Sequence, residues 1–103
     1  MILMATYRMP GNKTEEWSKC VFKMSANSLP SCIKKWNTFS CFDGDEGGFK
    51  GYNLIYIEEG KADEALIEIS KLILPFCEIE GASWKLEPLF ALSDSLKILG
   101  KSK

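Results

Sequence analysis

The sequence predicts an α+β domain with the ferredoxin-like order β-α-β-β-α-β: a four-stranded antiparallel sheet, two helices on one of its faces, and a short C-terminal helix. Three observations support this fold class. Four segments are rich in aromatic and β-branched residues, as strands are. Two further segments carry apolar residues at steps of three and four, the period of a helix. A polar, glycine-rich stretch joins the second and third strands as a hairpin. The 103 residues are enough for one domain, placed at residues 1–103.

A strand and an amphipathic helix open the chain. Residues 2–9 are mainly apolar on both alternating faces, and Pro10-Gly11 ends this strand with a turn. The helix has Asn12 or Thr14 as its expected N-cap and ends before Pro30. Its buried stripe is expected to consist of Trp17, Cys20, Val21 and Met24.

Residues 33–42 and 48–59 are the expected strands of the hairpin, and residues 43–48 are its polar, solvated tip. The strand at 48–59 is the one around which the chain is organised. Both of its faces are largely apolar, whereas a half-exposed strand alternates apolar with polar residues. We therefore expect this strand to be covered on both sides.

The second helix begins near Ala62, with Asp63 and Glu64 in the first turn, where acids stabilise the helix dipole. Pro75 is expected to stop it. Its apolar positions fall at helical spacing and are Ala62, Ala65, Leu66, Ile69, Leu72, Ile73 and Phe76.

The fourth strand is expected within residues 82–92. Pro88 cannot donate a ladder hydrogen bond, so this strand is bulged or lies at an edge of the sheet. A short last helix follows at residues 94–99, capped by Ser93 and ended by Gly100. The large side chains expected to share one face of the strand are Trp84, Leu86 and Phe90.

Two helices can cover only one face of the sheet, yet three strands carry apolar residues on both faces. A second copy of the chain would cover the other face, because a two-fold dimer buries the same patch on each subunit. We therefore expect a homodimer closed sheet to sheet, which is a dimeric α+β barrel.

Net charge and composition exclude several classes of partner. The net charge is −1, and the lysines are dispersed without a basic stripe, so nucleic acid is not an expected partner. The apolar opening, residues 1–5, is too short to span a bilayer and lacks the features of a signal peptide. No membrane association is expected, and the cytoplasm is the expected location.

Metal and cofactor sites are also not expected. The chain has no His, and its four cysteines, which are Cys20, Cys32, Cys41 and Cys77, show no C-x-x-C pairing. The usual zinc frameworks and the histidine ligand of haem are therefore missing. We expect no metal and no cofactor, with the cysteines acting as reduced, small apolar side chains.

Several motifs resemble one family of small uncharacterised dimeric α+β barrel proteins, over about residues 1–92. These motifs are Met1-Ile2-Leu3-Met4-Ala5-Thr6-Tyr7 followed by Pro10-Gly11-Asn12, Trp36, the run from Gly51 to Glu59, Ala62-Asp63-Glu64-Ala65, and Glu87-Pro88-Leu89. The resemblance implies the fold and a dimer but no chemistry. Proteins related in fold include cofactor-independent antibiotic-biosynthesis monooxygenases, haem-degrading oxygenases and stress-responsive barrel proteins.

A ligand site is predicted from the polar and aromatic side chains of the strands. Rings can stack on a flat organic molecule, while Tyr hydroxyls and the Asn amide fix its orientation. Arg8, the single arginine, could hold a carboxylate or phosphate, or form a surface ion pair. The other hypothesis for the aromatic residues is plain packing in the dimer interface. The candidate ligand-binding residues are Arg8, Trp36, Asn37, Tyr52, Tyr56 and Trp84.

The first functional hypothesis is a homodimer that binds a small organic molecule in the cleft between its sheet and the partner. An alternative is a cofactor-independent monooxygenase-like enzyme acting on an aromatic substrate. A further alternative is a structural or protein-interaction module whose interface is filled.

The binding hypothesis requires Tyr52 and Tyr56 on one face of their strand, since they are four residues apart in an element of period two. Ile55 and Ile57 should then point toward the helices. Trp36 is expected to share the tyrosine face if the hairpin register allows it.

Overall fold

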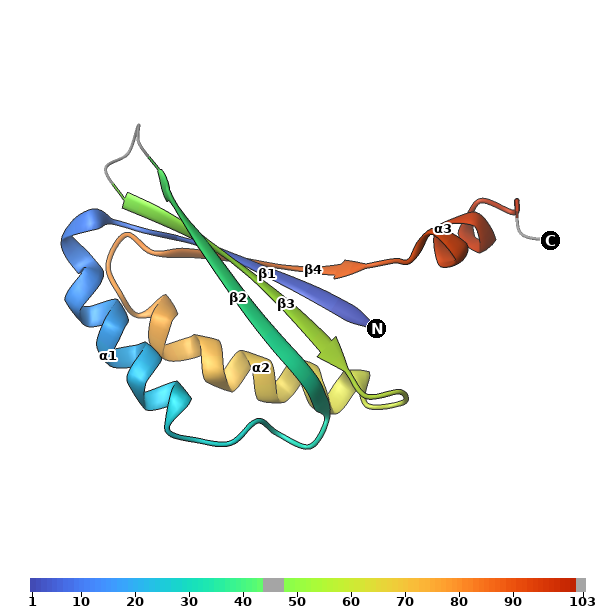
Figure 1. Ribbon diagram of the computed structural model, residues 1–103, viewed down its shortest axis with the longest axis horizontal. Helices are drawn as coiled ribbons and strands as arrows, with labels where there is room; N and C mark the ends of the chain where they lie inside the picture. The colour runs from blue at the N-terminus through green and yellow to red at the C-terminus, as the bar shows by residue number, and fades with distance from the viewer. Residues whose placement is uncertain (44–47, 102–103) are drawn as a thin grey trace.

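A computed structural model describes residues 1–43 and 48–101 of the chain. The elements follow the predicted order β-α-β-β-α-β, and a third helix comes last (Figure 1). They are β1 (Ile2–Met9), a 3-10 turn (Gly11–Lys13), α1 (Thr14–Ser25), β2 (Ile33–Asp43), β3 (Gly48–Ile57), α2 (Ala62–Cys77), β4 (Ser83–Leu89) and α3 (Leu92–Ile98). Most of the predicted hairpin tip, residues 44–47, lies outside the described residues.

The four strands form one sheet in the order β2-β3-β1-β4, and every neighbouring pair is antiparallel. Helices α1 and α2 lie together on one face of this sheet (Figure 1). The α+β, ferredoxin-like fold class is therefore confirmed. β4 is an edge strand paired only with β1, which is the position that Pro88 requires.

The two central strands alternate strictly between the two faces of the sheet. On the face that carries the helices, the buried side chains are Leu3, Ala5, Tyr7 and Met9 of β1, and Asn53, Ile55 and Ile57 of β3. Leu3, Ala5, Ile55 and Ile57 form the main core with Ala65, Ile69 and Ile73 of α2, whereas Tyr7 and Met9 belong to a second cluster with Ile79. The predicted orientation of Ile55 and Ile57 toward the helices is confirmed, and Tyr52 and Tyr56 belong to the opposite face.

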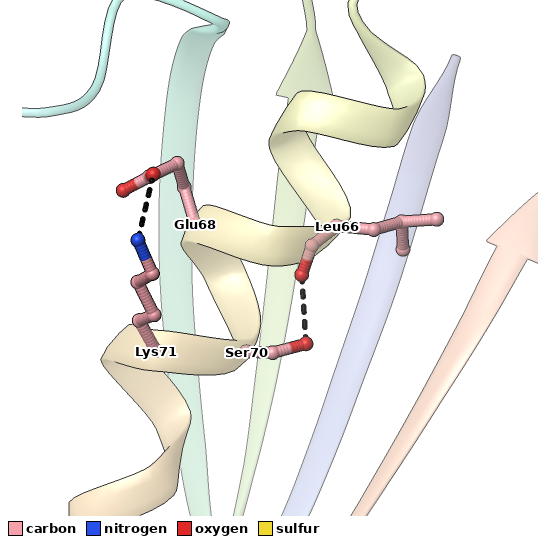
Figure 2. A network of polar contacts seen from close by, with 4 residues as sticks. All are labelled: Leu66, Glu68, Ser70 and Lys71. Atoms are coloured by element: carbon pink, nitrogen blue, oxygen red, sulfur yellow. Dashed lines mark hydrogen bonds and ion pairs between the residues drawn. The ribbon is translucent and has the colours of Figure 1, made fainter.

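The outer side of α2 is exposed and carries polar residues together with apolar ones, among them Ile67 and Leu74, which are 58% and 59% exposed. Figure 2 shows the Glu68 carboxylate 3.4 Å from Lys71 Nζ, and the Ser70 hydroxyl donating to the Leu66 carbonyl at 2.7 Å. Exposed pairs at this spacing contribute only a few tenths of a kcal/mol. The stability of α2 therefore comes from the apolar residues that it buries against the sheet.

The boundaries of the helices differ from the sequence predictions at three points. Neither Asn12 nor Thr14 caps α1 through its side chain; a 3-10 turn leads directly into the helix instead. Pro75 does not stop α2, which continues to Cys77. The proline lies in the last turn, where only one intrahelical hydrogen bond is lost. α3 starts earlier than predicted, with Ala91 rather than Ser93 at its N-cap position.

Gly51 leaves room for the Tyr7 ring against β3. The two residues are paired across β1 and β3, and a Cβ atom at position 51 would overlap the Tyr7 ring. Tyr7 is buried and packs on Trp84, with ring centroids 4.9 Å apart. A glycine is therefore needed here for packing rather than for its backbone freedom.

We predict that Gly51→Ala destabilises the fold by about 2–3 kcal/mol, because the added methyl group overpacks a filled core. Urea unfolding followed by tryptophan fluorescence measures the effect. In a Tyr7→Leu background the same substitution should cost clearly less, because the ring that it displaces is gone. Equal costs in both backgrounds would contradict the packing explanation.

Candidate functional site

The face of the sheet opposite α1 and α2 is not covered by any described element of this chain (Figure 1). We call it the open face. Strand pairing arranges its side chains in rows across β2, β3, β1 and β4. These rows are Lys35–Tyr56–Ile2–Leu89, Asn37–Leu54–Met4–Glu87, Phe39–Tyr52–Thr6–Lys85 and Cys41–Lys50–Arg8–Ser83. The centre of the open face is thus mainly apolar and aromatic.

Three predicted site residues come together near this centre. Tyr52 and Tyr56 flank Leu54 on β3, and Asn37 of β2 is paired directly with Leu54. Asn37 is therefore a diagonal neighbour of both tyrosines, at a separation that long side chains can span. All three residues are half-buried.

The rim of the open face is basic. Lys35 Nζ lies 5.7 Å from the centre of the Tyr56 ring, which is cation–π geometry. Lys85 pairs with Glu87 at 3.7 Å. The side chains in the four rows that are charged at neutral pH are Arg8, Lys35, Lys50, Lys85 and Glu87. Four cations and one acid give these rows a positive balance in a chain whose net charge is −1.

Trp36 lies on the helix-carrying face, so the expectation that it shares the tyrosine face is wrong. Continuous pairing from Ile33 and Ile57 would have set Trp36 opposite Leu54. A bulge between Ile33 and Lys35 inserts one residue and sets Trp36 opposite Ile55 instead. A one-residue shift moves every following side chain to the other face.

Asn53 holds Trp36 in place from inside the sheet. Its Oδ1 accepts hydrogen bonds from Trp36 Nε1 at 3.0 Å and from the Thr38 hydroxyl at 2.8 Å. Its Nδ2 donates to the Ala5 carbonyl at 3.1 Å. Asn53 is 3% exposed, and it is the buried polar residue of the described core. The signal for it in the sequence is one polar position on an otherwise apolar inward face.

Trp84 also lies on the helix-carrying face, paired with Tyr7. It packs in an aromatic cluster, with its ring 4.9 Å from that of Tyr7 and 5.6 Å from that of Phe76. Trp17 and Phe49 complete this cluster, with ring centroids 5.0 Å apart. The structure thus separates Trp36 and Trp84 from Asn37 and the two tyrosines by the thickness of the sheet.

A hollow of about 280 Å³ borders Trp84 beside α2. Two further hollows lie beside predicted site residues but away from the centre of the open face. One, of about 300 Å³, is bordered by Trp36 and Thr38 and closed by residues of α1, α2 and the loop after α1. The other, of about 290 Å³, is bordered by Arg8 at the end of β1 and by the backbone of Gly48 and Gly81. Both are at the small end of the range for organic ligands.

Titratable groups offer few chemical options in residues 1–43 and 48–101. In this part of the chain no group of three or more Cys, Asp or Glu side chains could hold a metal ion. The four cysteines are free thiols. Partial burial, together with the adjacent Glu78 carboxylate, raises the pKa of the Cys77 thiol, which makes it a weaker nucleophile at neutral pH. Across the same residues, no helix has the length and apolar character needed to cross a membrane.

No protein-family model matches this chain, and no curated protein matches it. Among solved structures, a DUF3240 family protein from Shewanella baltica OS155 is similar, with a TM-score of 0.41 and 10% sequence identity. The match covers 87% of this chain and 91% of that chain. A likeness of this size carries no functional conclusion, and membership of the family suggested by the motifs stays a prediction. The function must be inferred from the residues themselves.

Asn53→Ala is predicted to destabilise the fold by about 2–4 kcal/mol, because it leaves the Trp36 N–H and the Ala5 carbonyl without their partner. Denaturant unfolding measures this cost. Thr38→Val is the matched control: it removes one bond to the same oxygen from an exposed position and should cost about 1 kcal/mol or less. Similar costs for the two variants would show that the buried network is unimportant.

Tyr7 gives a prediction for pH dependence. Burial raises the pKa of its hydroxyl. The polar N–H of the neighbouring Trp17 opposes this shift less strongly, without reaching hydrogen-bonding geometry. No described group lies within hydrogen-bonding geometry of the Tyr7 hydroxyl. The folded state therefore favours the neutral phenol more than the unfolded state does. This contribution to stability is complete below the unfolded pKa of about 10 and is lost as pH rises through the folded value.

Tyr7→Phe should remove this alkaline loss of stability, and at neutral pH it should be neutral or mildly stabilising because an unpaired hydroxyl is removed. Urea unfolding between about pH 9 and pH 11 tests this, in the range where tyrosine titrates. Tyr56→Phe, on the half-exposed open face, is the control for other alkaline effects. A Tyr7→Phe profile parallel to that of the natural chain would contradict the prediction.

Proposed function

We propose that the chain forms a homodimer closed sheet to sheet, which binds a small organic molecule in the cleft between the two open faces. The observation that carries this proposal is the grouping of Asn37, Tyr52 and Tyr56 on a face that the described elements leave uncovered. Two rings and one amide, converging on an apolar centre, are what an oriented aromatic ligand requires.

The homodimer follows from the apolar character of the open face. Leu54 lies between the two tyrosines on β3, and Ile2 and Met4 lie beside them on β1, on the side of β4. A contiguous apolar patch of this kind, rimmed by polar residues, is typical of an interaction surface. A two-fold axis lets one patch cover its own copy, so no second protein is needed.

The rim charge favours an anionic aromatic ligand. Lys35 already lies over the Tyr56 ring, and Lys50 and Arg8 form the last row of the same face. Two such basic faces would repel each other across a dry interface, because like charges at close range are unfavourable. A carboxylate or sulfonate on the bound molecule would reduce that repulsion while its ring stacks on the tyrosines.

The alternative of a monooxygenase-like enzyme is less well supported. Chemistry like that of the cofactor-independent monooxygenases can use Asn, Trp and Tyr around one substrate. Trp36 and Trp84 face the helices, so only Asn37 and the tyrosines would meet a substrate on the open face. The alternative of a filled, purely structural interface uses the same face and is separated from ligand binding by the experiment below.

Tyr52→Ala tests the proposal with anilinonaphthalene sulfonate, an anionic aromatic fluorophore, as the probe. We expect the natural homodimer to bind this probe saturably, and Tyr52→Ala to weaken binding by about tenfold through loss of ring stacking. Tyr52→Phe, which keeps the ring, should bind with nearly unchanged affinity. Light scattering of each variant reports the dimer.

Two results would overturn the binding proposal. One is the absence of saturable probe binding by the natural chain. The other is a Tyr52→Ala variant that mainly loses its dimer, by roughly 3–5 kcal/mol, as expected for truncation of a ring packed in a filled interface. A stable monomer at micromolar concentration would overturn the homodimer itself.

A further inference from the structure

The C-terminal arm, residues 90–101, leaves the sheet at the end of β4 and carries α3 away from α1 and α2 (Figure 1). We propose that the two copies of the chain exchange these arms, so that α3 of each chain packs on the open face of the other. This inference rests on the proposed homodimer but not on its ligand. It assigns the arm a role as a second contact that holds the two sheets together.

α3 has an apolar stripe that the described part of the chain leaves largely exposed. Leu92, Leu96 and Leu99 are spaced by four and three residues, which places them on one side of the helix. Their side chains are 76%, 37% and 69% exposed. Phe90, which links β4 to this helix, is also exposed. An amphipathic helix with its apolar side in water lacks the packing that normally stabilises it.

The local sequence nevertheless encodes a helix at this place. Asp94 lies in the first turn and Lys97 in the last, where each charge complements the helix dipole. Gly100 has a φ of 71°, and the Lys101 N–H donates to the Leu96 carbonyl at 2.8 Å, which together form a Schellman C-cap. These features contribute little to the stability of the helix unless it packs against an apolar surface.

A helix of this length does not persist in water by itself. α3 has 7 residues, whereas isolated helices shorter than about 12–15 residues are marginal even with good helix formers. Its stability must therefore come from packing of the leucine stripe against another apolar surface. The chain's own body does not supply that surface, because the arm extends beyond the end of the sheet.

The dimensions of the chain point to a second copy as the partner. Its accessible surface is 7154 Å², against about 5,800 Å² expected for a compact monomer of 11.6 kDa. The excess of about 1,300 Å² exceeds the roughly 800 Å² that each partner buries in a standard stable interface. The radius of gyration is 15.5 Å, against about 13 Å for a compact domain of this length.

Two of the uncovered apolar surfaces, the open face and the leucine stripe, belong to the same chain. In a two-fold dimer, each arm covers the open face of the other chain. Both surfaces are then buried with no other protein involved. The open face is also the large apolar surface that α1 and α2 leave uncovered. Exchange of arms between copies therefore accounts for the shape and the exposed stripe together.

The first test compares two double variants of the full chain. Leu92→Glu with Leu99→Glu places charges on the apolar stripe, and Ser93→Glu with Lys97→Glu places them on the polar side of the same helix. We expect the stripe variant to raise the dimer dissociation constant by about 100-fold, from two lost apolar contacts, and the control to change it little. Sedimentation measures the dissociation constants, and unfolding curves verify that the body remains folded.

The second test locates the arm with the natural lysines. Dimers assembled from a mixture of ordinary and heavy-nitrogen-labelled chains are treated with a lysine crosslinker, and mass spectrometry separates links between chains from links within one chain. We expect links between chains that join Lys97 or Lys101 to Lys35, Lys50 or Lys85 on the open face. Lys19, Lys23 and Lys71, on the helices, should not form such links with the arm.

Each contrary result overturns the exchange of arms. An unchanged dissociation constant for the stripe variant would do so while leaving the homodimer and its probe binding intact. Arm links found only within one chain would show that α3 folds back on its own body. A natural chain that is monomeric would overturn both this inference and the proposed homodimer.

Discussion

The rest of the molecule depends on one constraint: both faces of the sheet carry apolar residues, but helices cover only one of them. The central strands β1 and β3 place apolar side chains on both faces, but α1 and α2 lie on one face only. On the covered face, Leu3, Ile55 and Ile69 have essentially no contact with water. On the other face, the equivalent positions of the same strands stay half-exposed. Because burial of apolar area is the main favourable term in folding and association, this imbalance favours a further contact.

The sequence predicted the elements and the sheet faces well because both follow from simple periods. Alternation in β3 separates Ile55 and Ile57 from the tyrosines, and steps of three and four locate α2. Periodicity cannot detect an inserted residue, however. The bulge near Lys35 reverses the face of Trp36, and nothing in the local composition marks it. The predicted site was therefore divided between two faces of the sheet.

Helix ends were predicted less well than strands, for a related reason. The N-cap preference of Asn12 and Ser93 is a local energy of about 1 kcal/mol, which the path of the chain readily overrides. Gly100, by contrast, was placed correctly, since a positive φ is costly for other residues and so fixes the end of α3. Strong local constraints survive in the folded chain, whereas weak preferences yield to tertiary structure.

Asn53, on the covered face, fixes the strands that carry the candidate site residues of the open face. It joins β1, β2 and β3 through bonds to Ala5, Trp36 and Thr38. Its neighbours in sequence, Tyr52 and Leu54, point to the open face. The buried network thus fixes the strands from which the candidate site residues project. A site built on such a rigid central strand can hold two rings at a constant separation without depending on a loop.

The proposed ligand and the proposed arm would use the same apolar surface, so their effects cannot be independent. A molecule bound between two open faces adds contacts that exist only in the dimer, and it therefore stabilises the dimer by mass action. The arm supplies further contacts at that interface, which lowers the cost of assembling the cleft. By linkage, the factor by which the bound ligand strengthens the dimer equals the factor by which dimerisation raises the affinity for the ligand. Under these two proposals, the isolated chain is extended because the surface on which its arm packs belongs to the partner.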